Sequence, residues 1–348
     1  MHIATQNAPL SNKLVFLLRF PPPPLPAFKS IHTGDWENFY RTVEMVAKAE
    51  APPPSSSPLE FEFTYDAAAT NSSLLEEVGY DLGAFIDKHP GSTISYGSEL
   101  RPLSQIEPLL QHHPSYEHFK RNMLEGIDYP LEEISDEARR VILDKSIAPR
   151  NHKSALKEEE RPHVSKLMTE DVELGYGIPL TVDCIRNLPG AEVYPIGVQN
   201  QLTINEKGEV IPKKRVTHNL SFNRKDGTSV NQRVREEEMP EVIYGHTMHR
   251  FLHLIHHLRW NHPHERILCN KIDIEKAYRR LHTKASVAVK CVAIWCLDSM
   301  WKNPQHQQND EIAVLLTRLP FGSSPAPGEF SETSETMFDL ANDLLYCS

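Results

Sequence analysis

Asp273 is the residue whose surroundings first suggest chemistry, because it is an acidic side chain within an apolar run. It lies near the end of RILCNKIDI, residues 266–274, which is typical of a buried strand, and Ala277 and Tyr278 follow after a charged turn. An Asp at such a place commonly caps the next turn or helix, and for Asp273 alone that structural role is the favoured interpretation. The alternative is a metal ligand, because Mg²⁺ prefers oxygen ligands.

A basic ribbon is the second feature that could bind a charged ligand. The segments GVQNQLTI and EVIPKKRVTHNLSF flank the turn NEKG, which predicts a pair of strands carrying Lys207, Lys213, Lys214 and Arg215. Residues 205–235 hold eight Lys and Arg against three Asp and Glu, a net charge of +5. The whole chain has a net charge of −10, which taken alone argues against nucleic-acid binding, but the local field decides where phosphate binds.

Three segments, in this order and spacing, resemble the motifs of reverse transcriptases. KIDIEKAYRRL, residues 271–281, resembles motif A, and LPFGSSPAPGEF, residues 319–330, resembles the motif B of Gypsy-type retrotransposon polymerases. Upstream, KKRVTHNLSFNRKDGTSVNQ resembles the fingers motif, with Arg215 at its basic position. The resemblance covers roughly residues 150–348.

The resemblance implies RNA-directed DNA synthesis, with a primed RNA or DNA template and a deoxynucleoside triphosphate (dNTP) as partners. Two Mg²⁺ ions would activate the primer hydroxyl and stabilise the triphosphate. Asp273 would be the catalytic carboxylate and a metal ligand, and the carbonyl of Ile274 would also reach a metal. Tyr278 would exclude a ribose 2′ hydroxyl. The implied nucleotide-binding residues are Lys213, Lys214, Arg215, Ile274, Ala277, Tyr278, Phe321 and Gly322, with Gly322 allowing a close backbone approach.

The chain also departs from the family pattern. Asn219 stands where the fingers motif usually has Asp, and Ser221 where it usually has Arg. The second catalytic element of the family contains an Asp-Asp dipeptide, and none occurs in the 348 residues. We therefore expect a polymerase fragment that does not synthesise DNA as this chain. The alternatives are a non-catalytic remnant that still binds nucleic acid and a Pro-rich interaction protein that docks partners through polyproline segments.

The predicted fold class is α+β, as a partial right-hand polymerase made of fingers and an incomplete palm. Residues 1–99, with PPPPLP and APPPSSSP, are expected to be a Pro-rich, acidic and largely disordered arm, and residues 100–196 a helical extension. Residues 197–348 would be the polymerase part. Strands are expected at 286–297 and 311–319, and helices at 136–147, 161–175 and 325–345.

A helix opened by Pro240 is predicted to have one apolar and one histidine-rich face. The apolar residues are Met248, Phe251, Leu252, Ile255 and Leu258, and the opposite stripe is His246, His249, His253, His256 and His257. A solvated or phosphate-facing stripe is favoured over a metal site, because no Cys or acidic residue on this helix completes a ligand set.

Composition favours an intracellular protein without a membrane anchor. The five cysteines are odd in number and form no C-x-x-C pair, and the early apolar run LVFLLRF is far too short to span a bilayer. Cytoplasm and nucleus remain equally open. Missing palm strands would leave a sheet edge uncovered, so self-association through that edge is expected.

Overall fold

The computed structural model describes residues 41, 45, 57–147, 151–205, 207–222, 228–239, 247–267, 274–296 and 311–346. The chain divides into two compact units. One comprises Met1–Ser30 and Glu241–Glu275, and the other comprises Ile31–Pro240 and Lys276–Ser348. Asp273 and most of the predicted strand at 266–274 lie outside the described residues, as do the segment PPPPLP and nearly all of APPPSSSP.

A three-stranded antiparallel sheet lies at the centre of the second unit. Its order is β1 (Gly177–Leu180), β5 (Glu311–Leu316) and β4 (Val292–Cys296), with Gly177 opposite Leu316 and Val292 opposite Leu315. Every residue of these three strands is buried. Because successive side chains point to opposite faces, a sheet covered on both sides needs an almost continuous apolar sequence, as β4 and β5 have.

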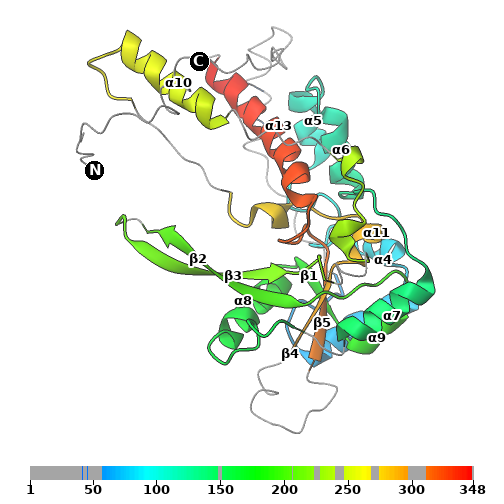
Figure 1. Cartoon of the computed structure of the whole chain (residues 1–348). Helices are drawn as coiled ribbons and strands as arrows, with labels where there is room; N and C mark the ends of the chain where they lie inside the picture. The colour runs from blue at the N-terminus through cyan, green and yellow to red at the C-terminus, as the bar shows by residue number, and fades with distance from the viewer. Residues whose placement is uncertain are drawn as a thin grey trace. The chain divides into compact units, whose positions relative to one another are not determined.

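Helices cover one face of this sheet. Ala313 and Leu315 pack in a core with residues of α3 (Tyr65–Glu77), α4 (Leu82–Lys88), α7 (Asp136–Ile147) and α9 (Val182–Asn187). The other face carries Ile312, Val314 and Leu316 and packs on α8 (Arg161–Glu173) and the base of the β2–β3 ribbon. The arrangement is mixed α+β, as predicted (Figure 1).

The expectation of a largely disordered arm over residues 1–99 is wrong for residues 65–88. Ala67, Ala68 and Leu75 of α3 are fully buried, because small residues on that face let the helix approach β1 closely. The buried Asn71 amide exchanges hydrogen bonds with the Glu60 backbone at 2.8 and 3.0 Å and donates to Pro179 O at 3.2 Å. A segment expected to be disordered is thus a core helix whose buried amide is fully hydrogen-bonded.

The boundary expected between residues 196 and 197 does not separate two bodies. β1 comes from the predicted helical extension and pairs with β5 from the predicted polymerase part. β4 is paired on its other side too, because Tyr194 N donates to Val292 O at 3.0 Å. The predicted self-association through an uncovered edge stays a prediction.

The predicted ribbon is present as β2 (Ile196–Ile204) and β3 (Val210–His218), which pair antiparallel and extend away from the sheet (Figure 1). The predicted helix at 161–175 is α8, with Pro162 in its first turn and Gly175 at φ +69° just beyond its end. The strand expected at 286–297 is confirmed only for β4, because Ala285–Ala288 form the short helix α11.

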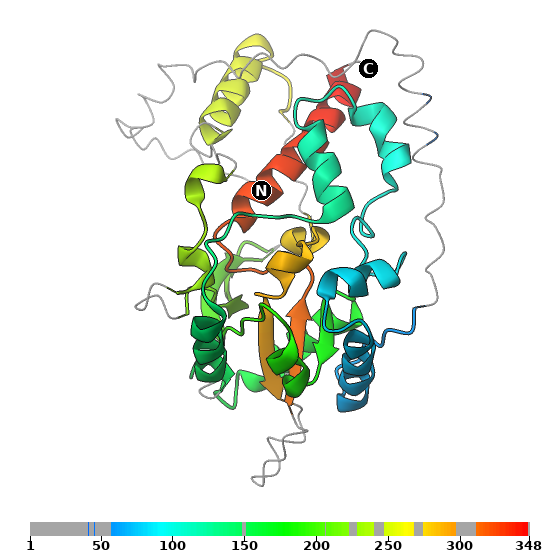
Figure 2. The same ribbon diagram turned by 90° about the vertical axis from the view of Figure 1, so that its right-hand side faces the viewer.

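The predicted C-terminal helix is α13 (Ala326–Tyr346). Beside it lie α5 (Leu103–Leu110) and α6 (Tyr116–Glu125), and Figure 2 shows α13 and these helices together above the sheet. His118 of α6 lies 3.2 Å from the Glu329 carboxylate and 3.3 Å from that of Glu332. The Glu329 hydrogen bond raises the pKa of His118, so the protonated imidazole reinforces this contact.

The first unit contains α10 (Thr247–Asn261), which begins after the position that Pro240 predicted. Phe251, expected on a core face, is 44% exposed. No helix within the described part of the chain is both long enough and apolar enough to cross a membrane.

Candidate functional site

Three segments that are distant in sequence meet in the second unit. They are the end of β3, the 3₁₀ turn η4 (Ala277–Arg280) and the loop 319–324 that leads into α13. The backbone joins them, because His218 N donates to Phe321 O at 3.2 Å and Leu319 N donates to Leu281 O at 3.0 Å. These segments carry the predicted fingers, motif A and motif B residues.

Aromatic rings and one guanidinium form the surface where these segments meet. The Arg215 guanidinium lies over the Phe321 ring, 5.6 Å from its centroid, and the Phe321 and Tyr278 rings stack with centroids 6.2 Å apart. Phe330 of α13 meets Tyr278 edge-on at 5.6 Å. Phe321 is 38% exposed, so the row is open to solvent on one side. A cation over a ring and stacked rings are both favourable arrangements.

Gly322 is where the loop comes closest to β3. Its φ is +119°, and a Cβ placed there would lie 2.1 Å from His218 O. The close approach that the structure shows at this glycine is to β3, and the role of Gly322 in lining a nucleotide pocket stays a prediction. Only glycine fits, because both the backbone conformation and the space exclude a side chain.

Arg279 contacts all of the segments that meet here. Its Nη1 donates to Leu319 O at 3.0 Å, and its Nη2 lies 2.8 Å from the Asp171 carboxylate of α8 and 3.0 Å from His218 Nε2. The side chain is 11% exposed. Arg279, Asp171 and His218 were not predicted from the sequence. An Arg directly after Tyr278 looks like an ordinary surface residue until its hydrogen-bond partners are known.

His218 is held neutral at the centre of this junction. Burial, followed by the nearby Arg279 charge, puts the pKa of His218 well below its ordinary value. A guanidinium only donates hydrogen bonds, so Nε2 accepts and Nδ1 carries the proton. Among the described residues Nδ1 has no hydrogen-bond partner, and the Tyr194 ring packs edge-on against the imidazole at 5.3 Å.

The three predicted cations of β3 do not act as one group. Lys214 points to α8, where its Nζ lies 2.9 Å from the Glu160 carboxylate. Arg215 lies on the other face of the strand with Lys213, because side chains alternate. Among the described residues no carboxylate lies within ion-pair distance of Lys213 or Arg215. Within this part of the chain, their positive charge therefore has no counter-ion.

Asn219 and Ser221, the two positions where the chain departs from the fingers motif that it resembles, both form side-chain hydrogen bonds. Asn219 Nδ2 lies 2.8 Å from His152 Nε2, and Ser221 Oγ accepts from Asn231 Nδ2 at 3.0 Å. Asn231 also donates to Gly322 O at 2.9 Å and accepts from Ser324 N at 3.0 Å. The ribbon is thus tied to the loop 319–324 without Asp at position 219 or Arg at position 221.

The predicted metal site cannot be assembled from the described residues. Asp273 lies outside them, and Ile274 belongs to the first unit, where it is 41% exposed. In the described parts of the chain no three His, Cys, Asp or Glu side chains gather as metal ligands. Mg²⁺ binding stays a prediction from the sequence.

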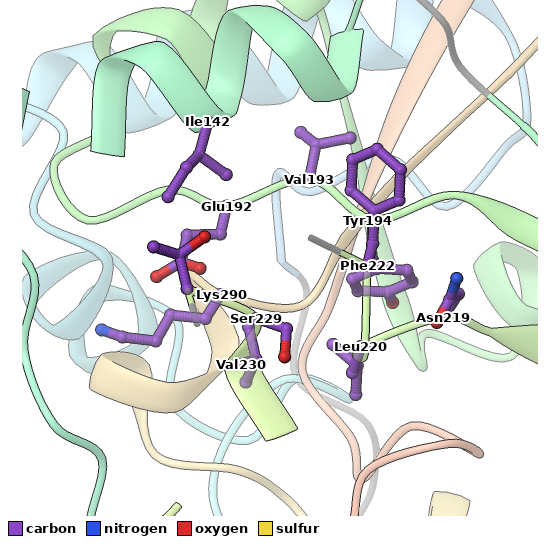
Figure 3. A pocket seen from close by; sticks show the side chains of 11 residues that line it. Ile142, Glu192, Val193, Tyr194, Asn219, Leu220, Phe222, Ser229, Val230 and Lys290 are labelled. Atoms are coloured by element: carbon purple, nitrogen blue, oxygen red, sulfur yellow. The ribbon is translucent and has the colours of Figure 1, made fainter. Parts of the chain in front are cut away.

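A small cavity of about 20 Å³ lies beside the base of the ribbon (Figure 3). Glu192, on its wall, forms a buried two-point ion pair with Arg233 at 2.5 and 2.6 Å. Burial raises the pKa of Glu192, although Arg233 opposes that rise. The buried Lys290 donates to Ser286 O at 3.1 Å. These charges have partners within the protein, so we do not include the cavity in the candidate site.

No protein-family model, curated protein or solved structure matches this chain. The proposals below therefore depend on its own residues and geometry.

Proposed function

We propose that the second unit carries the nucleotide pocket of an RNA-directed DNA polymerase of the retrotransposon type. One observation carries the proposal. Arg215, Tyr278 and Phe321 come from three separate sequence motifs, and they lie in one continuous row of contacts, with Gly322 beside Phe321 packed on β3. Helix and strand periodicity alone gives no reason for these side chains to meet.

The chemistry of the row suits a nucleoside triphosphate. A guanidinium binds phosphate oxygens through two parallel hydrogen bonds, and an ammonium adds a point charge, so Arg215 with Lys213 would hold the triphosphate. The flat faces of Tyr278 and Phe321 would pack against the sugar and the base. The resemblance also implies Asp273 as a ligand of Mg²⁺, which would activate the primer hydroxyl, and this part of the proposal rests on the sequence alone.

A second candidate is binding without synthesis. It is favoured by the basic ribbon, because residues 205–235 carry a net charge of +5 within a chain whose net charge is −10. In this case Lys213 and Arg215 would bind a primed template through phosphate contacts, with strong salt dependence.

Nucleotide binding by residues 1–348 tests the proposal. A fluorescent dNTP is titrated in Mg²⁺ buffer, and we expect saturable binding that Arg215→Ala weakens at least about tenfold, since a hydrogen-bonded charge pair contributes roughly 1.5–3 kcal/mol. Arg186→Ala is the matched control, because Arg186 pairs with Asp144 at 2.9 Å on the helices α9 and α7, away from the site. Equal weakening by both variants, or no binding by the parent protein, would refute the proposal.

Primer extension separates the two candidates. Both predict salt-dependent binding of a primed template, but only the first predicts template-directed synthesis when an Asp-Asp hairpin is supplied downstream. We expect none from residues 1–348 themselves. Synthesis by this chain that Asp273→Asn abolishes would show that another carboxylate completes the site.

A further inference from the structure

Two neighbouring arginines in the turn η4 have different surroundings. Arg280 reaches the segment 93–99, where its Nη1 lies 2.9 Å from the Glu99 carboxylate. Arg279 contacts a separate set of groups, which are the Asp171 carboxylate, the His218 imidazole and Leu319 O. Of these two arginines, it is Arg279 that bonds to the segments carrying the proposed nucleotide residues.

Each segment of the row lies next to a contact of Arg279. Tyr278 precedes Arg279 directly, Leu319 is two residues before Phe321, and His218 is three residues after Arg215. The backbone bond from His218 N to Phe321 O closes this set of contacts into a ring. A displacement of the Arg279 side chain would therefore change the spacing of all three members of the row.

The acceptors around Arg279 need a guanidinium. They are a carbonyl oxygen, a carboxylate oxygen and an imidazole nitrogen, at 3.0, 2.8 and 3.0 Å, and they belong to three different segments. Arginine presents several donors in a fixed planar fork, whereas lysine presents one compact ammonium on a flexible stem. A lysine could keep the charge opposite Asp171 but could not hold all three acceptors in this arrangement.

We propose that Arg279 is a positioning residue for nucleotide binding, which sets the spacing of Arg215, Tyr278 and Phe321 through its bonds to β3, α8 and the loop 319–324. The inference rests on the proposed function, because the row is the surface that would bind the nucleotide. A merely structural arginine would contribute to stability alone, as an ion pair does anywhere in the fold.

The experiment compares Arg279→Met, Arg279→Lys and Arg280→Met in the full chain. Arg280→Met is the matched control, since it removes an arginine with a carboxylate partner from the same turn without touching the row. Each variant is measured for fluorescent dNTP affinity and for amide hydrogen exchange at His218 and Leu319, whose N–H groups bond across the junction. Asp171→Asn serves as a second variant if Arg279→Met does not fold.

We expect Arg279→Met to weaken dNTP binding about tenfold or more, since small misplacements in a site of this kind are costly, and to speed exchange at both amides. Arg279→Lys should be intermediate, and Arg280→Met should stay within about twofold of the parent affinity. Parent-like dNTP affinity in Arg279→Met or in Asp171→Asn would overturn the positioning role while leaving the proposed function intact. Failure of the parent protein to bind dNTP at all would instead refute the proposed function, and the inference with it.

Discussion

Replacing Gly322 by Ala tests whether the loop before α13 really lies against the end of β3. The added Cβ would lie 2.1 Å from His218 O, and His218 O is backbone that also accepts from Leu220 N at 3.0 Å, so it cannot turn away like a flexible side chain. The loop must move instead, which breaks the bond from His218 N to Phe321 O.

The expected cost has three parts. The backbone conformation at φ +119° costs a residue with a side chain about 1–3 kcal/mol, overpacking costs about 1–3 kcal/mol, and the broken hydrogen bond costs about 1 kcal/mol. Together these lower the free energy of unfolding by about 3–7 kcal/mol. Gly208→Ala is the control, because Gly208 has φ +82° in the ribbon turn with nothing within 4 Å of the added Cβ. It should cost only about 1–2 kcal/mol.

Urea denaturation followed by circular dichroism measures both changes. The difference between the two variants isolates the contact with β3, since both glycines have positive φ and, of the two, Gly322 alone is crowded. If Gly322→Ala shifted the unfolding midpoint no more than Gly208→Ala does, the loop would not pack on β3. The row of Arg215, Phe321 and Tyr278 would then lose its structural basis.

Three further predictions concern charge. Lys213→Ala with Arg215→Ala should flatten the log-log salt dependence of primed-template binding by about 0.9 for each phosphate that the protein no longer binds, and an unchanged slope would place the binding surface elsewhere. His218 is neutral in the folded protein, because its pKa lies well below the ordinary 6.5, so the unfolded chain binds a proton first as the pH falls. The free energy of unfolding should therefore be greatest above about pH 6.5 and decrease toward pH 5. In urea titrations, His218→Gln should remove this part of the decrease. Arg233→Met should lower the free energy of unfolding by about 3–5 kcal/mol, because it leaves Glu192 buried without its partner. The double variant with Glu192→Leu should recover stability in the same unfolding curves if the loss comes from the buried charge and not from poorer packing.

The elements best predicted from the sequence are those whose ends are set by local chemistry. Pro162 and Gly175 bound α8 because proline suits a first helical turn and glycine accepts the positive φ that follows a helix. The ribbon follows from two strand-like runs around a glycine turn, and α13 from its apolar spacing. In each of these the signal and the structure lie within the same twenty or so residues.

Elements defined by distant partners were missed. β1 has four residues and contains Pro179, so nothing local marks it as a strand, and it forms because β5 offers it an edge. α3 was placed in the disordered arm because Ala67, Ala68 and Asn71 have little apolar surface, yet their small size suits a close helix contact. α11 and β4 were merged because a short apolar run does not reveal its period.

The same contrast between local signals and distant partners applies to the residues of the candidate site. Arg215, Tyr278, Phe321 and Gly322 could be named from motifs, and the structure brings them together. Lys214 was grouped with Arg215 because the two are adjacent, but alternation along a strand sends it to Glu160 instead. The role of Arg279 could not be predicted from the sequence, because it depends on hydrogen bonds to acceptors in three other segments.

The pairing of β1 with β5 fixes the smallest piece of this chain that could be produced for experiments. Cutting before residue 197 would remove β1 and leave Ala313 to Leu316, which are completely buried in the intact fold, paired with β4 on one side only. That stretch would become an apolar strand edge with free backbone groups, which is a template for aggregation. α3 would go with it, together with the Asn71 bond to Pro179 O. Material for nucleotide binding therefore needs a chain that begins before about residue 57, even though every side chain proposed to touch the nucleotide comes after residue 210.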